Sequence, residues 1–301
     1  MANANKRHPG DTEKKVIECI EDFIYKVQNE NRSISKHKLF SSLQTFAKKG
    51  IADRIVKDET LYRARLIKNN DKLNGDFPFE GFDKAGSKQP PNDKAMAMRA
   101  NYERIPYLYC STSAYGALSE IRPYINARIS LAEIKVVEEL KCFVMELPTK
   151  KSCADESAFV EKNITLLVQL SNMFQKPVEY GENEYDYYPT QRIAEFLKNL
   201  GYDAIIYKSA FDMDSSNYCI FNYDKCEVIS SRVYSTTELT YSFAEILPTN
   251  HLSELDIRGK VAKLTSSIYK SICGEELQNN LTAVKKLQRV LKTITGDENW
   301  K

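Results

Sequence analysis

Residues 99–123 contain the runs Arg99-Ala-Asn101, Ile105-Pro-Tyr-Leu-Tyr109-Cys-Ser-Thr-Ser113 and Ala117-Leu-Ser-Glu120-Ile-Arg-Pro123. The aromatic run predicts a strand over residues 107–111, because aromatic side chains are enriched in strands. The hydroxyl residues that follow it are candidate N-caps for a helix that carries Glu120. An arginine, an aromatic strand and a helical carboxylate are therefore expected close together.

Two further clusters lie on either side of this segment. Upstream, Leu61-Tyr-Arg63-Ala-Arg65 falls in a predicted strand over residues 60–66. The alternation of side chains along a strand places Arg63 and Arg65 on the same face. Downstream, Gly201-Tyr-Asp-Ala-Ile-Ile-Tyr-Lys-Ser209 predicts a buried strand that ends near a serine, and Asn217-Tyr-Cys-Ile-Phe221 predicts the next one.

The rest of the chain mixes short strands with helices. Apolar residues at three- and four-residue spacings predict two helices within residues 11–50, with Ser35 as N-cap and Gly50 as the end of the second. Residues 69–93 form a long polar loop. Further helices are expected over 158–174, from 189 to 200 and in the tail from 252, and further strands over 129–137, 142–147 and 226–234. The strands over 129–137 and 142–147 should form an antiparallel pair. Without regular βαβ alternation, this order predicts an α+β fold.

Composition excludes several classes of protein. Lys plus Arg number 43 and Asp plus Glu 41 in 301 residues. This near balance argues against a protein that coats nucleic acid. No apolar run is long enough for a membrane span, and the first residues show no secretory signal. The 7 cysteines lack a Cys-x-x-Cys pair and the 3 histidines lie far apart, so we expect a cytoplasmic protein with reduced thiols and no metal.

An Arg-rich strand, a Glu on a helix and a Ser ending a strand, in that order, resemble the RES-domain family, which is named for these residue types. The resemblance covers about residues 58–235 and includes Tyr188-Pro-Thr-Gln191. It implies a fold like that of mono-ADP-ribosyltransferases, with two small, mostly antiparallel sheets flanked by helices around an NAD cleft. It divides the chain into a helical extension over 1–55, a catalytic domain over 56–240 and a helical extension over 241–301.

The resemblance also implies an activity, the cleavage of NAD at the nicotinamide–ribose bond, and a role for each matching residue. The catalytic residues would be Glu120, Arg63 and Ser209, and the substrate-binding residues would be Arg99, Tyr109, Arg65, Asn101, Gln191 and Asn217. Nicotinamide leaves as a neutral base and needs no general acid, so one carboxylate that stabilises the ribosyl cation suffices. Arginine forks suit the pyrophosphate, and an aromatic wall suits the nicotinamide ring. NAD is then a substrate, and no cofactor is required.

Each of these residues also has a structural interpretation. Arg63 and Arg99 could form ion pairs, Glu120 could pair with Arg122, and Ser209 could be a turn hydroxyl. The ordered set favours function over these separate interpretations.

The acceptor of the ADP-ribosyl group stays open between water and inorganic phosphate. Many protein-modifying ADP-ribosyltransferases carry Gln or Glu two positions before the catalytic Glu, where this chain has Leu118. A small acceptor is therefore favoured, and transfer to a protein is the second choice. RES proteins are commonly toxins, so the resemblance implies growth arrest or phage defence and an antitoxin or regulatory partner. The terminal helices could also mediate homo-oligomerisation.

A nuclease is the remaining alternative. Arg32-Ser-Ile-Ser-Lys-His37 has the Arg-x4-His spacing of HEPN-type RNases, and helical extensions that resemble HEPN modules accompany some RES proteins. A histidine base and a phosphate-binding arginine could cleave RNA. Only two positions define this motif, so a scaffold role is the stronger interpretation of residues 1–55.

Overall fold

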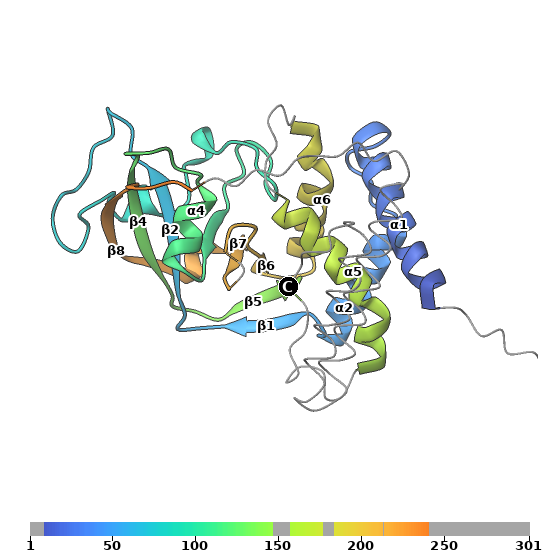
Figure 1. The fold of residues 1–301 in the computed structure, drawn as a ribbon. Helices are drawn as coiled ribbons and strands as arrows, with labels where there is room; N and C mark the ends of the chain where they lie inside the picture. Colours follow the sequence, from blue (N-terminus) through green and yellow to red (C-terminus); the bar gives the residue numbers. More distant parts are fainter. Residues whose placement is uncertain (1–8, 147–156, 177–183, 213, 241–301) are drawn as a thin grey trace, which may run out of the picture. The chain divides into compact units, whose positions relative to one another are not determined.

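The computed structural model describes residues 9–146, 157–176, 184–212 and 214–240 (Figure 1). The described residues fall into two compact units. The larger contains residues 19–146, 167–176, 184–212 and 214–240, and the smaller contains residues 9–18 and 157–166. All strands described below belong to the larger unit. The predicted helices of the tail lie outside the described residues.

Eight strands form one mixed sheet in the order β1-β5-β6-β7-β3-β2-β4-β8. Their bounds are β1 Asp53–Val56, β2 Thr60–Leu66, β3 Leu108–Ser111, β4 Arg128–Val136, β5 Leu140–Val144, β6 Ala204–Lys208, β7 Ser216–Ile220 and β8 Cys226–Ser235. Among these pairs, β5 and β6 are parallel and the others are antiparallel.

The sheet is nearly divided between β2 and β3. These strands share the single residue pair Tyr62↔Ser111, whereas β2 pairs with β4 along all of Thr60–Leu66. The strands therefore form two groups, β1-β5-β6-β7-β3 and β2-β4-β8, which Figure 1 shows diverging. The two small, mostly antiparallel sheets that we expected correspond to these groups, although hydrogen bonding joins them into one sheet.

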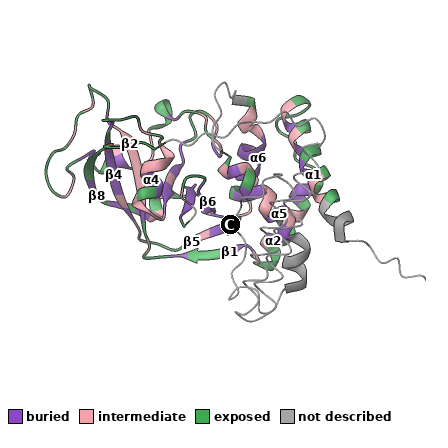
Figure 2. Ribbon diagram, in the orientation of Figure 1, coloured by how far each residue is buried: buried purple, intermediate pink, exposed green. Residues whose placement is uncertain are grey.

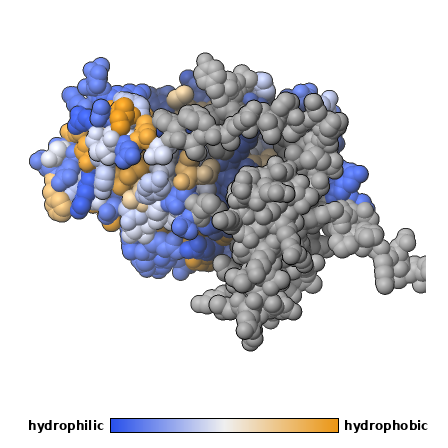
Figure 3. Space-filling view, in the orientation of Figure 1, coloured by the Kyte–Doolittle hydropathy of each residue, from blue (hydrophilic) through white to orange (hydrophobic). Residues whose placement is uncertain are grey.

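A buried apolar cluster extends across both groups and stabilises their junction. It includes Val56, Leu61, Leu108, Ile134, Leu140, Ile206 and Tyr218. Burying each such aliphatic side chain contributes about 1.5–3 kcal/mol. Figure 2 shows this burial along the central strands. On the face shown in Figure 3, the part of the surface that holds β2, β4 and β8 mixes hydrophobic with hydrophilic residues.

The helices are α1 Pro9–Asn29, α2 Lys38–Lys49, α3 Lys84–Ser87, α4 Ala114–Glu120, α5 Ser157–Gln175 and α6 Tyr188–Asn199. Short 3-10 turns cover Asn92–Lys94, Glu184–Tyr187 and Tyr223–Lys225. Phe40 of α2 stacks on Phe196 of α6 with ring centroids 4.3 Å apart, and Phe23 of α1 meets Phe40 edge-on. Within the described residues, no helix is long and apolar enough to cross a membrane.

The structure confirms the α+β class and most of the expected elements. The strand over residues 60–66 has the predicted bounds, and Gly50 ends α2 with a positive φ of 64°. The N-cap of α2 is His37 rather than Ser35, because the His37 imidazole accepts a hydrogen bond from the Leu39 backbone N–H. The loop over residues 69–93 contains the short helix α3.

One expectation about the strands fails, and one strand was missed. β4 and β5 do not pair, because β4 lies between β2 and β8 while β5 lies between β1 and β6. Neighbouring strands in a sequence usually pair, but here the chain crosses from one strand group to the other between them. The edge strand β1 was also not expected, since its four residues, Asp-Arg-Ile-Val, are too few to show a period.

Candidate active site

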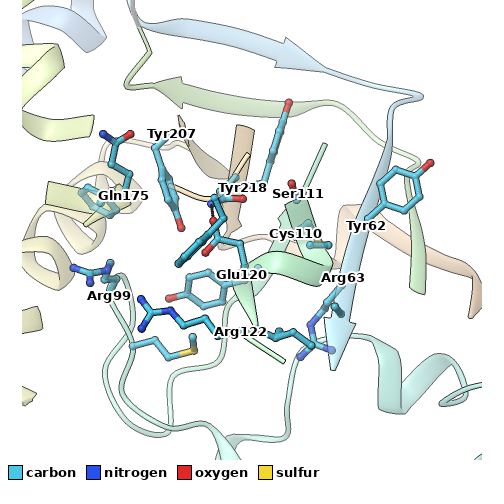
Figure 4. Close-up of a pocket in the computed structure, with 18 of the residues that line it drawn as sticks. Tyr62, Arg63, Arg99, Cys110, Ser111, Glu120, Arg122, Gln175, Tyr207 and Tyr218 are labelled. Atoms are coloured by element: carbon cyan, nitrogen blue, oxygen red, sulfur yellow. Dashed lines mark hydrogen bonds between the residues drawn. The ribbon is translucent and has the colours of Figure 1, made fainter. Parts of the chain in front are cut away.

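A pocket of about 420 Å³ lies where the two strand groups meet (Figure 4). Its lining includes Tyr62 and Arg63 from β2 and Tyr109 from β3, on opposite sides of the near-division of the sheet. Glu120 of α4 and Asn217 of β7 also line it. The narrow β2–β3 contact thus leaves room for a ligand between strands that are otherwise rigidly paired.

The sequence before Glu120 explains how α4 is held. The Ser113 hydroxyl caps the helix by accepting a hydrogen bond of 2.8 Å from the Gly116 N–H. Gly116 allows a close approach, since a Cβ at this position would lie 2.6 Å from the Oγ atoms of both Ser111 and Ser215. The helix is therefore packed tightly against the end of β3 and the start of β7, with Glu120 as its last residue.

Two side chains bind the same carboxylate oxygen of Glu120. The Ser209 hydroxyl donates to Oε1 at 2.7 Å, and Asn217 Nδ2 donates to Oε1 at 2.6 Å. Ser209 Oγ in turn accepts from the backbone N–H groups of Phe211 at 3.1 Å and Asp212 at 3.3 Å. No hydrogen bond from a described residue reaches Glu120 Oε2. One carboxylate oxygen is thus fixed and the other is available to a ligand.

The turn that follows β6 also holds the opposite end of α4. The Ser113 hydroxyl donates to Asp212 Oδ2 at 2.6 Å, and this bond lowers the pKa of the Asp212 carboxyl below its usual value. Ser209 contacts the last residue of α4, whereas Asp212 contacts its N-cap. One turn therefore fixes both ends of the seven-residue helix.

The charges that line the pocket are mostly positive. Glu120 is the single carboxylate among the lining residues that the structure describes, and the cations are Arg63, Arg99, Arg122 and Lys176. In Figure 4 the three arginines lie around the lower part of the pocket, below Glu120. Such a surface favours an anionic ligand that also carries a group complementary to one carboxylate.

Each arginine is held by its surroundings. Arg63 Nη1 donates to the Ser87 carbonyl at 3.2 Å. Burial and the neighbouring Arg65 lower the pKa of Arg63 to about 10, which still leaves it charged at neutral pH. The Arg99 guanidinium lies 5.5 Å from the centre of the Tyr187 ring, and that of Arg122 lies 5.2 Å from the Phe211 ring.

Aromatic side chains form another part of the lining. Tyr207 of β6 and Phe174 of α5 contact each other with ring centroids 5.6 Å apart, and both face the pocket. Burial raises the pKa of the Tyr207 hydroxyl, so this group stays neutral at physiological pH. Figure 4 shows its hydroxyl directed toward the region of Glu120.

The structure brings most of the predicted site residues together. Glu120, Arg63, Arg99, Tyr109 and Asn217 line the pocket. Ser209 is outside the lining but bonds directly to Glu120. The roles in NAD binding and catalysis stay predictions.

Three predicted substrate-binding residues lie outside the pocket lining and support it. Arg65 donates to the Gly86 carbonyl and lies over the Phe82 ring, so it holds the long loop. Asn101 Oδ1 accepts from the Tyr109 hydroxyl at 2.7 Å. Gln191 Nε2 donates to the backbone carbonyls of Met98 and Asn101 at 2.8 and 2.9 Å. Asn101 and Gln191 thereby fix the segment that carries Arg99.

Other lining residues were not predicted from the sequence. Arg122 lies two positions after Glu120. Tyr207 lies two positions before Ser209, and alternation along the strand puts the side chains of Tyr207 and Ser209 on the same face. Both could have been found by extending the motifs. Phe174 and Lys176 gave no signal, because the end of α5 reaches the pocket only through tertiary packing.

The proposed RNase motif is used for packing. His37 caps α2 through Nδ1, while its Nε2 lies 3.0 Å from Asp22 Oδ2, and its side chain is only 5% exposed. The Arg32 guanidinium lies over the rings of Tyr102 and Tyr188, at 4.4 and 3.9 Å from their centres. These contacts favour the scaffold interpretation of this segment.

The family model of the RES domain matches residues 60–244, which is more than half of the chain. The chain belongs to the RES-domain family. The matched region contains Arg63, Glu120 and Ser209, and thus the Glu120–Ser209 hydrogen bond joins two of the family's namesake residue types.

Comparison with solved structures gives a weak likeness. The crystal structure of the M. tuberculosis MbcT–MbcA toxin–antitoxin complex matches with 12% identity over 66% of this chain and 92% of that chain, at a TM-score of 0.35. At this score the likeness supports no conclusion. No curated protein matches the chain.

Proposed function

We propose that this RES protein cleaves the nicotinamide–ribose bond of NAD and transfers the ADP-ribosyl group to water or inorganic phosphate. The observation that carries the proposal is the fixed Glu120 carboxylate, which lines a pocket whose other lining residues include four cations and several aromatic rings. A substrate that suits this pocket carries anionic groups at one end and develops positive charge at another. NAD has both features.

The chemistry requires little from the protein beyond electrostatics. The C1″–N bond breaks with its electron pair moving to the pyridinium nitrogen, so nicotinamide leaves as a neutral molecule. The ribosyl carbon becomes cationic, and Glu120 stabilises it with a charge that Ser209 and Asn217 hold in place. An oxygen of water or phosphate then bonds to C1″ on the ribose; water loses a proton to solvent in this step.

The remaining lining residues would bind the substrate. Arg63, Arg99 and Arg122 offer guanidinium groups to the pyrophosphate. The aromatic pair Tyr207 and Phe174 offers a wall for the nicotinamide ring. Tyr109, one of the substrate-binding residues that the resemblance implied, uses its hydroxyl to bond Asn101 and also lines the pocket.

Water or phosphate is favoured over a protein acceptor. The position two residues before Glu120 is Leu118, which does not line the pocket. A leucine cannot hydrogen-bond a protein side chain into line with C1″. In the cell, we propose that loss of NAD makes the protein a growth-arresting toxin or anti-phage effector, restrained by an antitoxin or regulatory partner.

A product assay tests the reaction. The full-length protein is incubated with NAD in buffers with and without inorganic phosphate, and the products are identified by mass spectrometry. Nicotinamide with ADP-ribose indicates hydrolysis, and nicotinamide with ADP-ribose-1″-phosphate indicates phosphorolysis. Absence of nicotinamide release in both buffers would contradict the proposal.

Two variants make the assay specific to the site. Glu120→Gln keeps the shape but removes the charge, and it should lower turnover by about 10²–10³-fold. Glu138→Gln makes the same change at an exposed position between β4 and β5 and should retain full activity. Expression of the three proteins in bacteria, with growth and cellular NAD as readouts, tests the proposed toxicity. Growth arrest by Glu120→Gln without a fall in cellular NAD would exclude NAD cleavage as its cause.

A further inference from the structure

Part of the N-terminal extension packs against α6 although it precedes residues 60–244, the region that matches the RES family. Arg192 Nε of α6 donates to the Ile34 carbonyl at 2.9 Å, and the Arg192 side chain is only 12% exposed. One turn further along α6, Phe196 stacks on Phe40. The loop between α1 and α2 is therefore held firmly against this helix.

Arg32, in the same loop, lies between two tyrosine rings. Its guanidinium is 3.9 Å from the centre of the Tyr188 ring and 4.4 Å from that of the Tyr102 ring. Tyr188 is the first residue of α6, and Tyr102 directly follows Asn101. A planar guanidinium is well suited to stacking on aromatic faces. Arg32 thus joins the segment 98–102 to the start of α6.

The same two elements hold Arg99, which lines the pocket. Arg99 lies three positions before Tyr102, and its guanidinium lies 5.5 Å from the centre of the ring of Tyr187, the residue before Tyr188. Arg32 and Arg99 therefore contact neighbouring residues at one junction, although only Arg99 belongs to the pocket lining. Any shift of the segment relative to α6 would move the Arg99 guanidinium.

A buried side chain already ties this junction from within. Gln191 of α6 is 1% exposed, and its Nε2 donates to the carbonyls of Met98 and Asn101, on either side of Arg99. Arg32 joins the same two elements at an exposed position. Contacts at two separate points restrict rotation of one element against the other, which a single point of contact permits.

Resting on the proposed function, we propose that Arg32 is a positioning residue for NAD binding. It clamps the segment 98–102 to α6 and thereby holds Arg99 where that guanidinium meets the pyrophosphate. The N-terminal extension thus completes the substrate site of this RES protein from outside the matched region. The Arg-x4-His pair then serves NAD binding, with Arg32 as the clamp and His37 as the N-cap of α2.

Steady-state kinetics of full-length Arg32→Ala test the clamp, with thermal unfolding to show that each protein is folded. KM for NAD should rise by about 3- to 10-fold, because two exposed cation–π contacts that hold the junction are lost. The kcat should stay near the wild-type value, since a pyrophosphate contact acts equally in the ground state and the transition state.

Two control variants separate positioning from charge and from stability. Lys36→Ala removes a positive charge from an exposed position in the same loop and should leave KM unchanged. Lys141→Ala removes a cation that lies 4.6 Å from the centre of the Tyr202 ring, outside the pocket lining. It should lower the melting temperature without changing KM.

A double-mutant cycle shows whether Arg32 acts through Arg99. Arg99→Gln alone should raise KM by about 10-fold or more, through loss of a charge-assisted contact. In that background, Arg32→Ala should change KM by less than about 2-fold, because the group that it positions is already gone. A merely structural role of Arg32 would lower the folded fraction, and hence kcat, by the same factor in both backgrounds.

Arg32→Lys keeps the test informative if Arg32→Ala does not fold. Lysine retains the charge and a long apolar stem but lacks the flat guanidinium that fits between the two rings. KM should still rise by about 2-fold or more with Arg99 present, and the rise should again disappear in the Arg99→Gln background.

The outcomes separate this inference from the proposed function. NAD cleavage by wild type would leave the proposed function intact, and the inference would then be overturned by any of three results. These are an unchanged KM in the folded Arg32 variant, an equal rise of KM in both backgrounds, and an equal rise of KM in Lys36→Ala. Failure of wild type to cleave NAD would overturn both.

Discussion

Replacing Ser209 by alanine should reduce catalysis without weakening NAD binding. Ser209 Oγ donates to Glu120 Oε1 at 2.7 Å, yet Ser209 itself does not line the pocket. A hydrogen bond to an ionised group contributes about 1.5–3 kcal/mol. If the whole of this contribution acts in the transition state, kcat falls by about 10- to 150-fold. KM should stay near the wild-type value.

Ser209→Ala should also lower stability modestly. The backbone N–H groups of Phe211 and Asp212 lose their shared acceptor, Ser209 Oγ. This costs about 1–2 kcal/mol of unfolding free energy, since solvent can replace part of the loss. Denaturant unfolding measures this change separately from kcat. The activity loss should therefore persist under conditions in which the variant is fully folded.

Ser215→Ala is the matched control for this variant. Its hydroxyl donates to the Asp212 carbonyl at 3.1 Å, so it stabilises the same turn without contacting Glu120. We expect a similar loss of stability with kcat close to wild type. Equal losses of kcat in both variants would show that the turn as a whole matters, and a raised KM with unchanged kcat in Ser209→Ala would place Ser209 against the substrate. Either result would refute the positioning role.

Three further changes test other parts of the site. Gly116→Ala introduces a Cβ at 2.6 Å from two serine hydroxyls. The cost of overpacking, about 1–3 kcal/mol, should exceed the small gain in helix propensity. The free energy of unfolding, measured with denaturant, and kcat should therefore both fall as α4 shifts. Arg63→Gln should raise KM for NAD by about 10-fold or more through loss of a phosphate contact, whereas Arg232→Gln on exposed β8 should not, as steady-state kinetics will show. The Ser113 hydroxyl lowers the pKa of Asp212, so the ionised carboxylate stabilises the fold above the unfolded-state pKa of about 3.9. This contribution should vanish as pH falls through the lower folded-state pKa, so the stability difference between wild type and Asp212→Asn should shrink below about pH 4.

Local sequence features sufficed for many individual elements. The strand over residues 60–66 was predicted with the bounds of β2, and the glycine at position 50 marked the end of α2, where a positive φ is required. Ser113 was among the candidate N-caps because capping depends on residues within one helical turn. The RES resemblance selected Arg63, Glu120 and Ser209 from residue types and their order. These features all depend on short-range stereochemistry or on motif order, both of which a sequence displays directly.

Tertiary structure alone decided how these elements meet. Which strands pair depends on burial across the whole sheet, so β4 and β5 separated although they are neighbours in the chain. The single β2–β3 residue pair that opens the pocket has no local signature.

The bonding of Glu120 is equally non-local. Its partners Ser209 and Asn217 come from 89 and 97 positions away, and only the register of β6 and β7 aligns them with α4. Sequence thus identified the chemical groups, because their types and order are written in the chain. The direction of each hydrogen bond, and hence which oxygen of Glu120 is left for a ligand, followed only from packing in three dimensions.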